Sequence, residues 1–450
     1  MAAWGKRISV TLALSVAVIT WECSAGTPVP IEAGANPHPV QLRRPPQAAL
    51  SATAILGKQI FYDHNLSASG SMTCASCHDP AHAYGPPDGA SARLGGVDGE
   101  TQGNRAVPGL RYAFHTPNFS IGPDIDEAGA LNPNQAASRS AGLVRVPKTA
   151  GSTASAVAMV PQGGLFWDGR VNTLQLQAVG PLLNPVEMAN PDIATVAAKL
   201  SRAPYAYSFV QVFGAGILQK PTLLVEEAMF AVARFQVEDV SFNPYTSKYD
   251  YWLEGKADLS PAESRGLKLF DDKDKANCAG CHIDKPGTDG QPPLFTDFQY
   301  EALGVPRNPV LKVNTDPAYH DLGLCGPIRH DIATQTQYCG MFRTPSLRNA
   351  ATRKVFFHNG VYHSLEDVLA FYDFRDVRPD KIYPKGPDGK PLKFDDIPKA
   401  YLANMDATDP PFDRKPGQAP AMTDQDMRDI IAFLGTLTDG YQPQASPAVR

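Results

Sequence analysis

Two copies of the pattern Cys-x-x-Cys-His are the strongest chemical feature of the sequence. They comprise Cys74, Cys77 and His78, and Cys278, Cys281 and His282. This spacing is the attachment signature of a c-type haem, in which both cysteines form thioethers to the porphyrin and the histidine binds the iron. The alternative is a pair of zinc or redox Cys-x-x-Cys motifs, and a histidine directly after both copies argues against it. The sequence therefore predicts two covalently bound c-type haems, with His78 and His282 as ligands of the haem irons.

A repeated stretch of sequence precedes each haem motif and indicates how it is positioned. Residues 56–63 and 265–272 share the pattern Gly-x-x-[Ile/Leu]-Phe, with apolar residues at helical spacing. Before the second copy, Ser260, Pro261 and Glu263 form a typical helix start. A helix that leads through a polar loop into the haem motif is how a cytochrome c-like module begins.

These features predict a mostly α protein of two tandem cytochrome c-like domains with long irregular loops. We expect an N-terminal haem domain over residues 26–250 and a C-terminal haem domain over residues 251–450, with the boundary near residues 249–258. Apolar residues at three- and four-residue spacing predict further helices at residues 193–202, 222–238, 364–372 and 423–437. No run alternates as a strand would. The long loop at 85–147 is expected to wrap the first haem or carry a docking surface.

The N-terminus reads as a secretory signal peptide over residues 1–25. Lys6 and Arg7 precede an apolar run at residues 8–20, and small residues follow, so we expect cleavage near Ala25. The apolar run is too short for a comfortable membrane span, and no later segment reaches that length. The mature chain is therefore expected to lack a membrane span and to be exported to the periplasm.

The remaining cysteines agree with an oxidising compartment. Cys23 leaves with the signal peptide, so Cys325 and Cys339 are left beside the four haem cysteines. Their natural interpretation is a disulfide. The alternatives are two free thiols or a soft-metal site. The formal net charge of −5 comes with no Lys/Arg run, so nucleic acid is not an expected partner.

Two further stretches carry a resemblance to a known family. The first is Leu-Phe-Trp-Asp-Gly-Arg at residues 165–170, continuing to Glu187 and Met188. The second is Phe-Arg-Thr-Pro-Ser-Leu-Arg-Asn at residues 342–349, followed by Phe-His-Asn-Gly at 357–360 and Ser-Leu-Glu-Asp at 364–367. In identity and order these motifs resemble the dihaem bacterial cytochrome c peroxidases and MauG-type enzymes. The resemblance spans roughly residues 50–440.

The resemblance implies roles for four residues around the first haem. Trp167 would lie between the two haems and relay electrons, whereas without the family context an aromatic residue is more often plain packing. Gln177, Pro181 and Glu187 match the pocket where peroxide binds, and Glu187 would be its acid/base. The alternative for Glu187 is a surface glutamate in a turn. His78 would be the proximal iron ligand of the peroxide-active haem, and His282 would be that of the electron-transfer haem.

The far-side ligands of the two irons distinguish the subtypes of the family. Peroxidases place a methionine opposite the second histidine, whereas MauG-type enzymes have a tyrosine, and the aligned residue here is Tyr372. Met341 and His358 remain alternatives, and Tyr372 could simply end an amphipathic helix. For the first haem, we interpret His82 as a residue near the ligands or on the surface. His115 is left as a possible distal ligand of the iron. If neither binds, the first haem is open to peroxide without prior reduction.

The family also tends to hold a calcium ion between its domains. The stretch at residues 342–349 that would contribute carbonyl ligands is intact, but an asparagine before the tryptophan motif is not evident. Arg145 and Lys148 stand in that region instead. Calcium takes oxygen ligands, and these cations would repel it.

Three functions follow from these motifs. The first is a MauG-like periplasmic enzyme that uses hydrogen peroxide to form a high-valent dihaem state and oxidises a Trp or Tyr residue of a partner protein. A finer resemblance, to the MbnH-like group, makes a copper-binding protein a candidate partner. The second is a dihaem cytochrome c peroxidase that reduces hydrogen peroxide with electrons from a small cytochrome c or a cupredoxin. The third is a non-catalytic dihaem electron-transfer cytochrome, which needs both irons to be six-coordinate.

Overall fold

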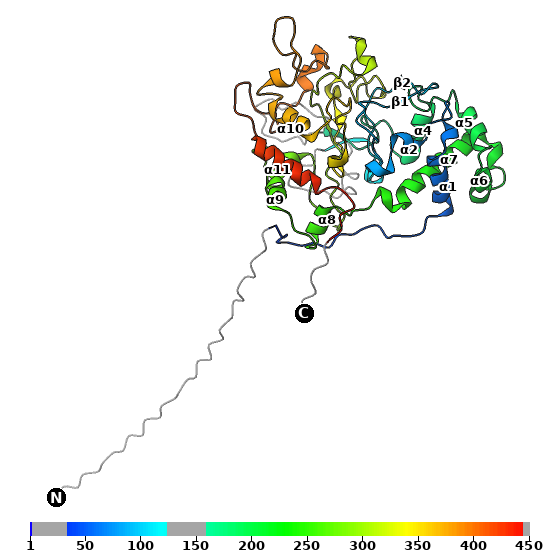
Figure 1. Ribbon diagram of the computed structural model, residues 1–450, viewed down its shortest axis with the longest axis horizontal. Helices are drawn as coiled ribbons and strands as arrows, with labels where there is room; N and C mark the ends of the chain where they lie inside the picture. Colours follow the sequence, from blue (N-terminus) through cyan, green and yellow to red (C-terminus); the bar gives the residue numbers. More distant parts are fainter. Residues whose placement is uncertain (2–33, 124–158, 444–450) are drawn as a thin grey trace. The chain divides into compact units, whose positions relative to one another are not determined.

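The computed structural model describes Met1, residues 34–123 and residues 159–443 of the 450-residue chain. The predicted signal peptide, Arg145 and Lys148 lie outside these residues. Helices and irregular loops dominate, as the sequence predicts, and strands are few and short (Figure 1). Within the described ranges, no helix has both the length and the apolar character needed to cross a membrane.

The helices follow the predicted pattern closely. The four predicted segments are α5 (Ile193–Leu200), α7 (Pro221–Glu238), α10 (Leu365–Phe374) and α11 (Asp424–Gly435). The two repeated stretches form α1 (Ala52–Phe61) and α9 (Pro261–Asp271). The helices that the sequence did not predict are α4 (Leu174–Leu183), α6 (Ala206–Phe213) and α8 (Lys248–Leu253). α4 holds Pro181 in its interior, and α8 has only six residues, too few to show a clear period.

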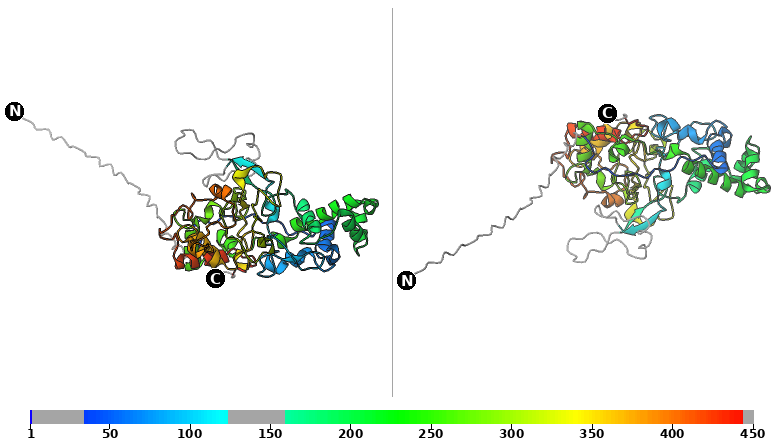
Figure 2. Two further views of the ribbon diagram at one scale, coloured as in Figure 1. Left: turned by 90° about the horizontal axis from the view of Figure 1, so that it is seen from above. Right: turned by 90° about the horizontal axis from the view of Figure 1, so that it is seen from below.

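Each haem motif follows a helix that packs closely on a later one. α1 lies beside α7, and α9 lies beside α11 (Figure 1). Figure 2 shows the first pair again, blue beside green. A Cβ atom on Gly57 would lie 1.9 Å from the Ala231 carbonyl oxygen, and one on Gly266 would lie 2.0 Å from that of Asp429. The repeated glycine is therefore a point of close helix approach in both pairs, with no room for a side chain.

Two main groups of buried side chains surround these pairs. The first is drawn from residues 56–242 and includes Phe61, Phe209 and Phe235. The second, apart from Leu42, is drawn from residues 249–437 and includes Phe270 and Phe433. Phe61 and Phe270 occupy the same position of the repeated pattern, and both are almost fully buried. The helix α8 lies where the sequence predicts the domain boundary, which stays a prediction.

The strands form three antiparallel pairs. β1 (Leu94–Gly95) pairs with β2 (Thr101–Gln102), β3 (Ser120–Pro123) with β4 (Met159–Gln162), and β5 (Tyr300–Glu301) with β6 (Phe342–Arg343). The segment expected to be a long loop thus contains β1, β2 and β3, and its residues 124–147 lie outside the described part.

The loop region after β5 is closed by a covalent bond. Cys325 and Cys339 form a disulfide, which confirms the pairing expected from the sequence. The pair is 14 residues apart in the chain.

Candidate haem sites and the region between them

The first haem motif lies at the wall of a cavity of about 590 Å³, the first cavity. Cys74 and Cys77 form the short helix α2 (Cys74–Cys77), which begins with a capping box between Thr73 and Ser76. The Nδ1 of His78 lies 3.2 Å from the Tyr84 carbonyl oxygen. Burial lowers the pKa of His78 to about 4, so the imidazole is neutral. The Nδ1–H donates to the carbonyl, and Nε2 with its free electron pair is left to bind iron.

The second haem motif repeats this arrangement in another cavity of about 200 Å³, the second cavity. Cys278 begins a single 3-10 turn, Cys278–Gly280, that leads to Cys281 and His282. The His282 Nδ1 lies 2.9 Å from the Phe295 carbonyl oxygen, and burial lowers the pKa of His282 to about 4. Both motifs thus have two unpaired thiols and one oriented neutral imidazole at a cavity wall. This donor set fits a covalently attached haem at each place.

Three residues matched to the peroxide pocket lie together in the wall of the first cavity. Gln177 and Pro181 belong to α4, whose N-cap is Thr173, and Glu187 follows in the turn after the helix. Asn184 Nδ2 donates a hydrogen bond of 2.6 Å to Glu187 Oε1. Burial raises the pKa of Glu187 above its ordinary value, although Asn184 and Arg170 oppose the rise. Glu187 therefore lines the cavity and is not a surface glutamate. Its raised pKa means that it keeps its proton to a higher pH than an ordinary glutamate does.

The two histidines considered as distal ligands of the first haem both lie elsewhere. Among the residues described, His78 is the single histidine that lines the first cavity. His115 Nε2 lies 2.9 Å from the Tyr245 hydroxyl oxygen, outside the cavity wall. His82 pairs with Asp79 at 2.7 Å and faces a different space. In this arrangement neither histidine closes the first cavity.

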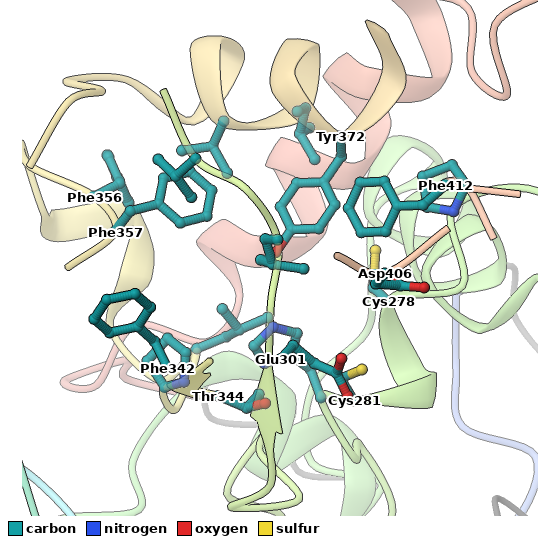
Figure 3. Close-up of a pocket in the computed structure, with 18 of the residues that line it drawn as sticks. Cys278, Cys281, Glu301, Phe342, Thr344, Phe356, Phe357, Tyr372, Asp406 and Phe412 are labelled. Atoms are coloured by element: carbon teal, nitrogen blue, oxygen red, sulfur yellow. The ribbon is translucent and has the colours of Figure 1, made fainter. Parts of the chain in front are cut away.

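Tyr372 projects from α10 into the second cavity (Figure 3). Its ring stacks on Phe412, with centroids 5.4 Å apart and planes 24° from parallel, and lies 6.2 Å from the Phe357 ring. Burial raises the pKa of Tyr372 well above its ordinary value. The aromatic neighbours hold the phenol in one direction, with its hydroxyl toward the space beside Cys278 and Cys281.

The alternatives to Tyr372 are placed differently. Met341 does not line the second cavity and packs instead with Tyr300 and Leu324. His358 does line it, stacked on Phe342 with ring centroids 3.5 Å apart, and its Nε2 has no hydrogen-bond partner among the described residues. Met422, which the sequence did not single out, also lines this cavity.

Trp167 contributes to the walls of both cavities. Its indole Nε1 donates a hydrogen bond of 2.8 Å to the Ala106 carbonyl oxygen, and its own carbonyl accepts one of 2.9 Å from the Arg343 backbone nitrogen. The indole is therefore oriented by a segment of the first cavity, and the backbone of Trp167 is fixed by β6. The role of Trp167 as an electron relay between two haems stays a prediction.

A network of buried charges holds the Trp167 loop. The fully buried Asp168 accepts hydrogen bonds from Arg105 at 2.7 Å and Arg170 at 2.8 Å. Arg105 also makes a bidentate pair with Asp321, at 2.6 and 2.7 Å. Burial acts to raise the pKa of Asp321, but Arg105 lowers it overall. Nothing in the sequence singles out Arg105 and Asp321, because they lie far along the chain from the motif and share no spacing with it.

Comparisons with known proteins agree with this geometry. The family model "Di-haem cytochrome c peroxidase" matches residues 51–258. The methylamine utilization protein MauG of Paracoccus denitrificans is 34% identical over 414 residues, which cover 89% of this chain and 91% of the relative. The cytochrome-c peroxidase IdrP1 of Pseudomonas sp. (strain SCT) is 29% identical over 362 residues, 75% of either chain.

A solved structure is similar over nearly the same length. The diheme peroxidase BthA from Burkholderia thailandensis E264 has a TM-score of 0.72 at 33% identity, covering 90% of this chain and 94% of that chain. The chain therefore belongs to the di-haem cytochrome c peroxidase and MauG family, whose members are haem oxidoreductases that act with peroxide and carry two covalently bound c-type haems.

Proposed function

We propose that this protein is a MauG-like enzyme of the periplasm that uses hydrogen peroxide to oxidise a Trp or Tyr residue of a partner protein. The observation that carries the proposal is Tyr372, whose phenol occupies the second cavity beside the Cys278 and Cys281 motif. An anionic oxygen ligand stabilises oxidised iron, which suits a centre that stores oxidising power. The similarity to a MauG protein supports the same conclusion.

The two haem motifs are proposed as the attachment points. Cys74 and Cys77 would bind the first haem and Cys278 and Cys281 the second, with His78 and His282 as axial ligands. The matched helix pairs, α1 with α7 and α9 with α11, support two tandem cytochrome c-like domains, one around each haem. The Cys325–Cys339 disulfide supports an oxidising location such as the periplasm.

The pocket residues of the first cavity would direct the proton that peroxide chemistry requires. A haem held there by Cys74, Cys77 and His78 would supply a redox-active iron centre able to donate the two electrons that cleavage of the peroxide bond requires. Glu187 would accept a proton from the nearer peroxide oxygen and return it to the departing oxygen, which leaves as water. Gln177 would donate a hydrogen bond that orients the peroxide, and Pro181 would shape the pocket wall.

The overall reaction then balances through the partner protein. One peroxide molecule takes two electrons and two protons and becomes two water molecules, and the electrons come from Trp or Tyr side chains of the partner. Trp167 would carry electrons between the haems, since it is the aromatic residue that contacts both cavities.

A peroxidase that draws its electrons from a small redox protein is the second candidate, favoured by the similarity to IdrP1. Stopped-flow spectroscopy of the fully oxidised protein with stoichiometric peroxide and no electron donor separates the two. A fast Soret change supports the MauG-like function. A reaction that begins only after one haem is reduced supports the peroxidase. Absence of any reaction in both states would leave a non-catalytic electron-transfer cytochrome and refute both.

A further inference from the structure

A third space, the middle chamber, lies between the two cavities and shares lining residues with each. It shares Pro108, Phe166 and Trp167 with the first cavity. With the second cavity it shares Trp167, Arg343 of β6 and several residues that follow β6 in the chain. Four arginines line it: Arg111, Arg343, Arg348 and Arg353. Among its described lining residues there is no aspartate and no glutamate.

Two of these arginines have carboxylate partners behind the chamber wall. Arg348 makes a bidentate pair with Asp250, at 2.7 and 2.9 Å. Arg111 lies 3.3 Å from Asp439. Their charges are therefore neutralised by the protein itself.

Arg353 has no such partner among the described ion pairs. Its guanidinium donates only to the carbonyl oxygens of Val355, at 3.3 Å, and Val107, at 3.0 Å. Burial alone lowers the pKa of Arg353 to about 10. Its Nη1 fills the space beside two glycines: a Cβ on Gly85 would lie 3.2 Å from it and one on Gly109 3.8 Å.

Those contacts place Arg353 beside the proximal side of the first haem site. The Tyr84 carbonyl that orients His78 directly precedes Gly85, and Val107 lines the first cavity. The positive charge of Arg353 also acts on the His78 imidazole.

Arg343 occupies the corresponding place at the second cavity. It lines both the middle chamber and the second cavity. Its guanidinium reaches the Phe166 carbonyl oxygen at 3.4 Å and the Thr116 hydroxyl at 3.3 Å, and no carboxylate among the described residues pairs with it. Burial lowers the pKa of Arg343.

Arg343 and Arg353 are half-buried, and a cation that is partly removed from water without a counter-ion is unfavourable, so we expect each to have a binding role. A haem brings two propionate carboxylates, and planar carboxylates are the groups that guanidinium binds best. We propose that Arg353 binds a propionate of the haem attached at Cys74 and Cys77, and that Arg343 binds a propionate of the haem attached at Cys278 and Cys281. The middle chamber, which Trp167, Arg343 and Arg353 line together, would then hold the propionate-binding residues of both haem sites.

This pairing has an electrostatic consequence for each iron. A guanidinium neutralises the negative propionate, which would otherwise stabilise the more positive, oxidised iron. Removing the charge of Arg353 therefore lowers the midpoint potential of the first haem, and removing that of Arg343 lowers that of the second. The unpaired propionate also takes up a proton more readily, so the potential becomes more dependent on pH.

The experiment is spectroelectrochemical titration of purified holoprotein, with resonance Raman spectra of the propionate bending modes. Arg353→Gln is expected to lower the potential of the first haem and shift its propionate band, and Arg343→Gln to do the same for the second haem. Lys354→Gln, which removes a charge from the exposed neighbouring residue, is the matched control and should change neither. Unchanged potentials and Raman bands in both arginine variants would overturn the proposal, as would effects on the opposite haems.

Arg353→Lys covers the case in which Arg353→Gln fails to mature with haem. Lysine keeps the positive charge but cannot form the bidentate hydrogen bonds of a guanidinium group. We expect a potential near that of the unmodified protein and a shifted propionate band, and a band identical to the unmodified protein would refute the contact. The readouts are independent of peroxide turnover, so this test can fail while the proposed function stands.

Discussion

Glu187 illustrates what the surroundings of one side chain contribute. It follows α4 in a turn that, on sequence alone, could lie on the surface, yet it lines the first cavity and accepts a hydrogen bond from Asn184. Burial raises the pKa of Glu187, so this carboxyl group loses its proton at a pH closer to neutral than an ordinary glutamate does. A carboxylate in that state can both accept and return a proton.

Glu187→Gln is expected to slow the reaction with peroxide by about 100- to 10,000-fold, the usual range for loss of an acid/base. The amide keeps the shape and the hydrogen-bonding capacity but cannot accept the proton. The rate is measured by stopped flow on the oxidised holoprotein. Glu226→Gln, the same change at an exposed position of α7, is the control. An unaltered rate in Glu187→Gln would remove Glu187 from the mechanism.

The raised pKa of Glu187 also predicts a pH profile. Glu187 must be deprotonated to accept the first proton, so the rate should fall as the pH drops through its pKa. Because burial raises that pKa, the acidic limb should lie above the ordinary glutamate range. The limb is measured as rate against pH and should vanish in Glu187→Gln. A limb that persists in the variant belongs to another group.

Tyr372 is the residue on which the subtype depends. Tyr372→Met should raise the midpoint potential of the second haem, because a thioether favours reduced iron and a phenolate favours oxidised iron. Tyr372→Phe should change the ferric absorption and electron paramagnetic resonance spectra through loss of the ligand. Tyr207→Phe, at an exposed tyrosine, is the matched control. If Tyr372→Phe leaves the spectra unchanged, His358 or Met422 becomes the candidate ligand, and each can be tested by its alanine variant.

At the scale of elements, the same helix contact is built twice. Gly57 of α1 meets the backbone of α7, and Gly266 of α9 meets the backbone of α11. Each contact is followed by a buried phenylalanine four residues on, Phe61 or Phe270. The helices that lead into the haem motifs are thereby fixed against helices that lie later in the chain.

Gly57→Ala and Gly266→Ala should each destabilise the protein by about 1–3 kcal/mol or more, because the added methyl group meets a backbone oxygen that cannot rotate away. Denaturant unfolding of holoprotein measures the loss. Gly435→Ala is the control, because that glycine ends α11 and a Cβ there meets no atom within 4 Å. If all three variants have the same free energy of unfolding, the helices can move apart without a loss of stability, and the close contact at the glycines is unimportant.

At the scale of the whole molecule, the buried charges and Trp167 join segments that are far apart in the chain. Arg105, Asp168 and Asp321 come from three separate stretches and form one network. The indole of Trp167 donates to the Ala106 carbonyl, and the Trp167 backbone carbonyl accepts from β6. The relay position is therefore a product of long-range packing and not of the local motif alone.

Trp167→Phe should abolish the spectroscopic signature of charge shared between the haems after peroxide is added, while the first Soret change persists. Phenylalanine keeps an aromatic ring but is much harder to oxidise and loses the hydrogen bond to Ala106. Near-infrared stopped-flow spectroscopy makes the measurement. Trp252→Phe, at a tryptophan that packs on Tyr249 and lines neither cavity, is the control. An intact shared signature in Trp167→Phe would rule out the relay.

The sequence by itself determined the features encoded over short distances. Cys-x-x-Cys-His is a local motif, the Ser260–Pro261–Glu263 start of α9 is a local cap, and the four helices with a clear apolar period lie within two residues of their predicted bounds. The disulfide followed from counting cysteines. These features depend on covalent spacing and on neighbouring residues, which the order of the chain fixes.

Only the tertiary structure decided which distant residues meet. It placed His115 and His82 outside the lining of the first cavity and put Tyr372 rather than Met341 at the second. It also gathered Arg343 and Arg353 around a chamber whose described lining residues include no carboxylate. It also supplied Arg105 and Asp321 as partners for the Trp167 loop. Contacts of this kind depend on how helices and loops pack across hundreds of residues, and a linear pattern carries no spacing that records them.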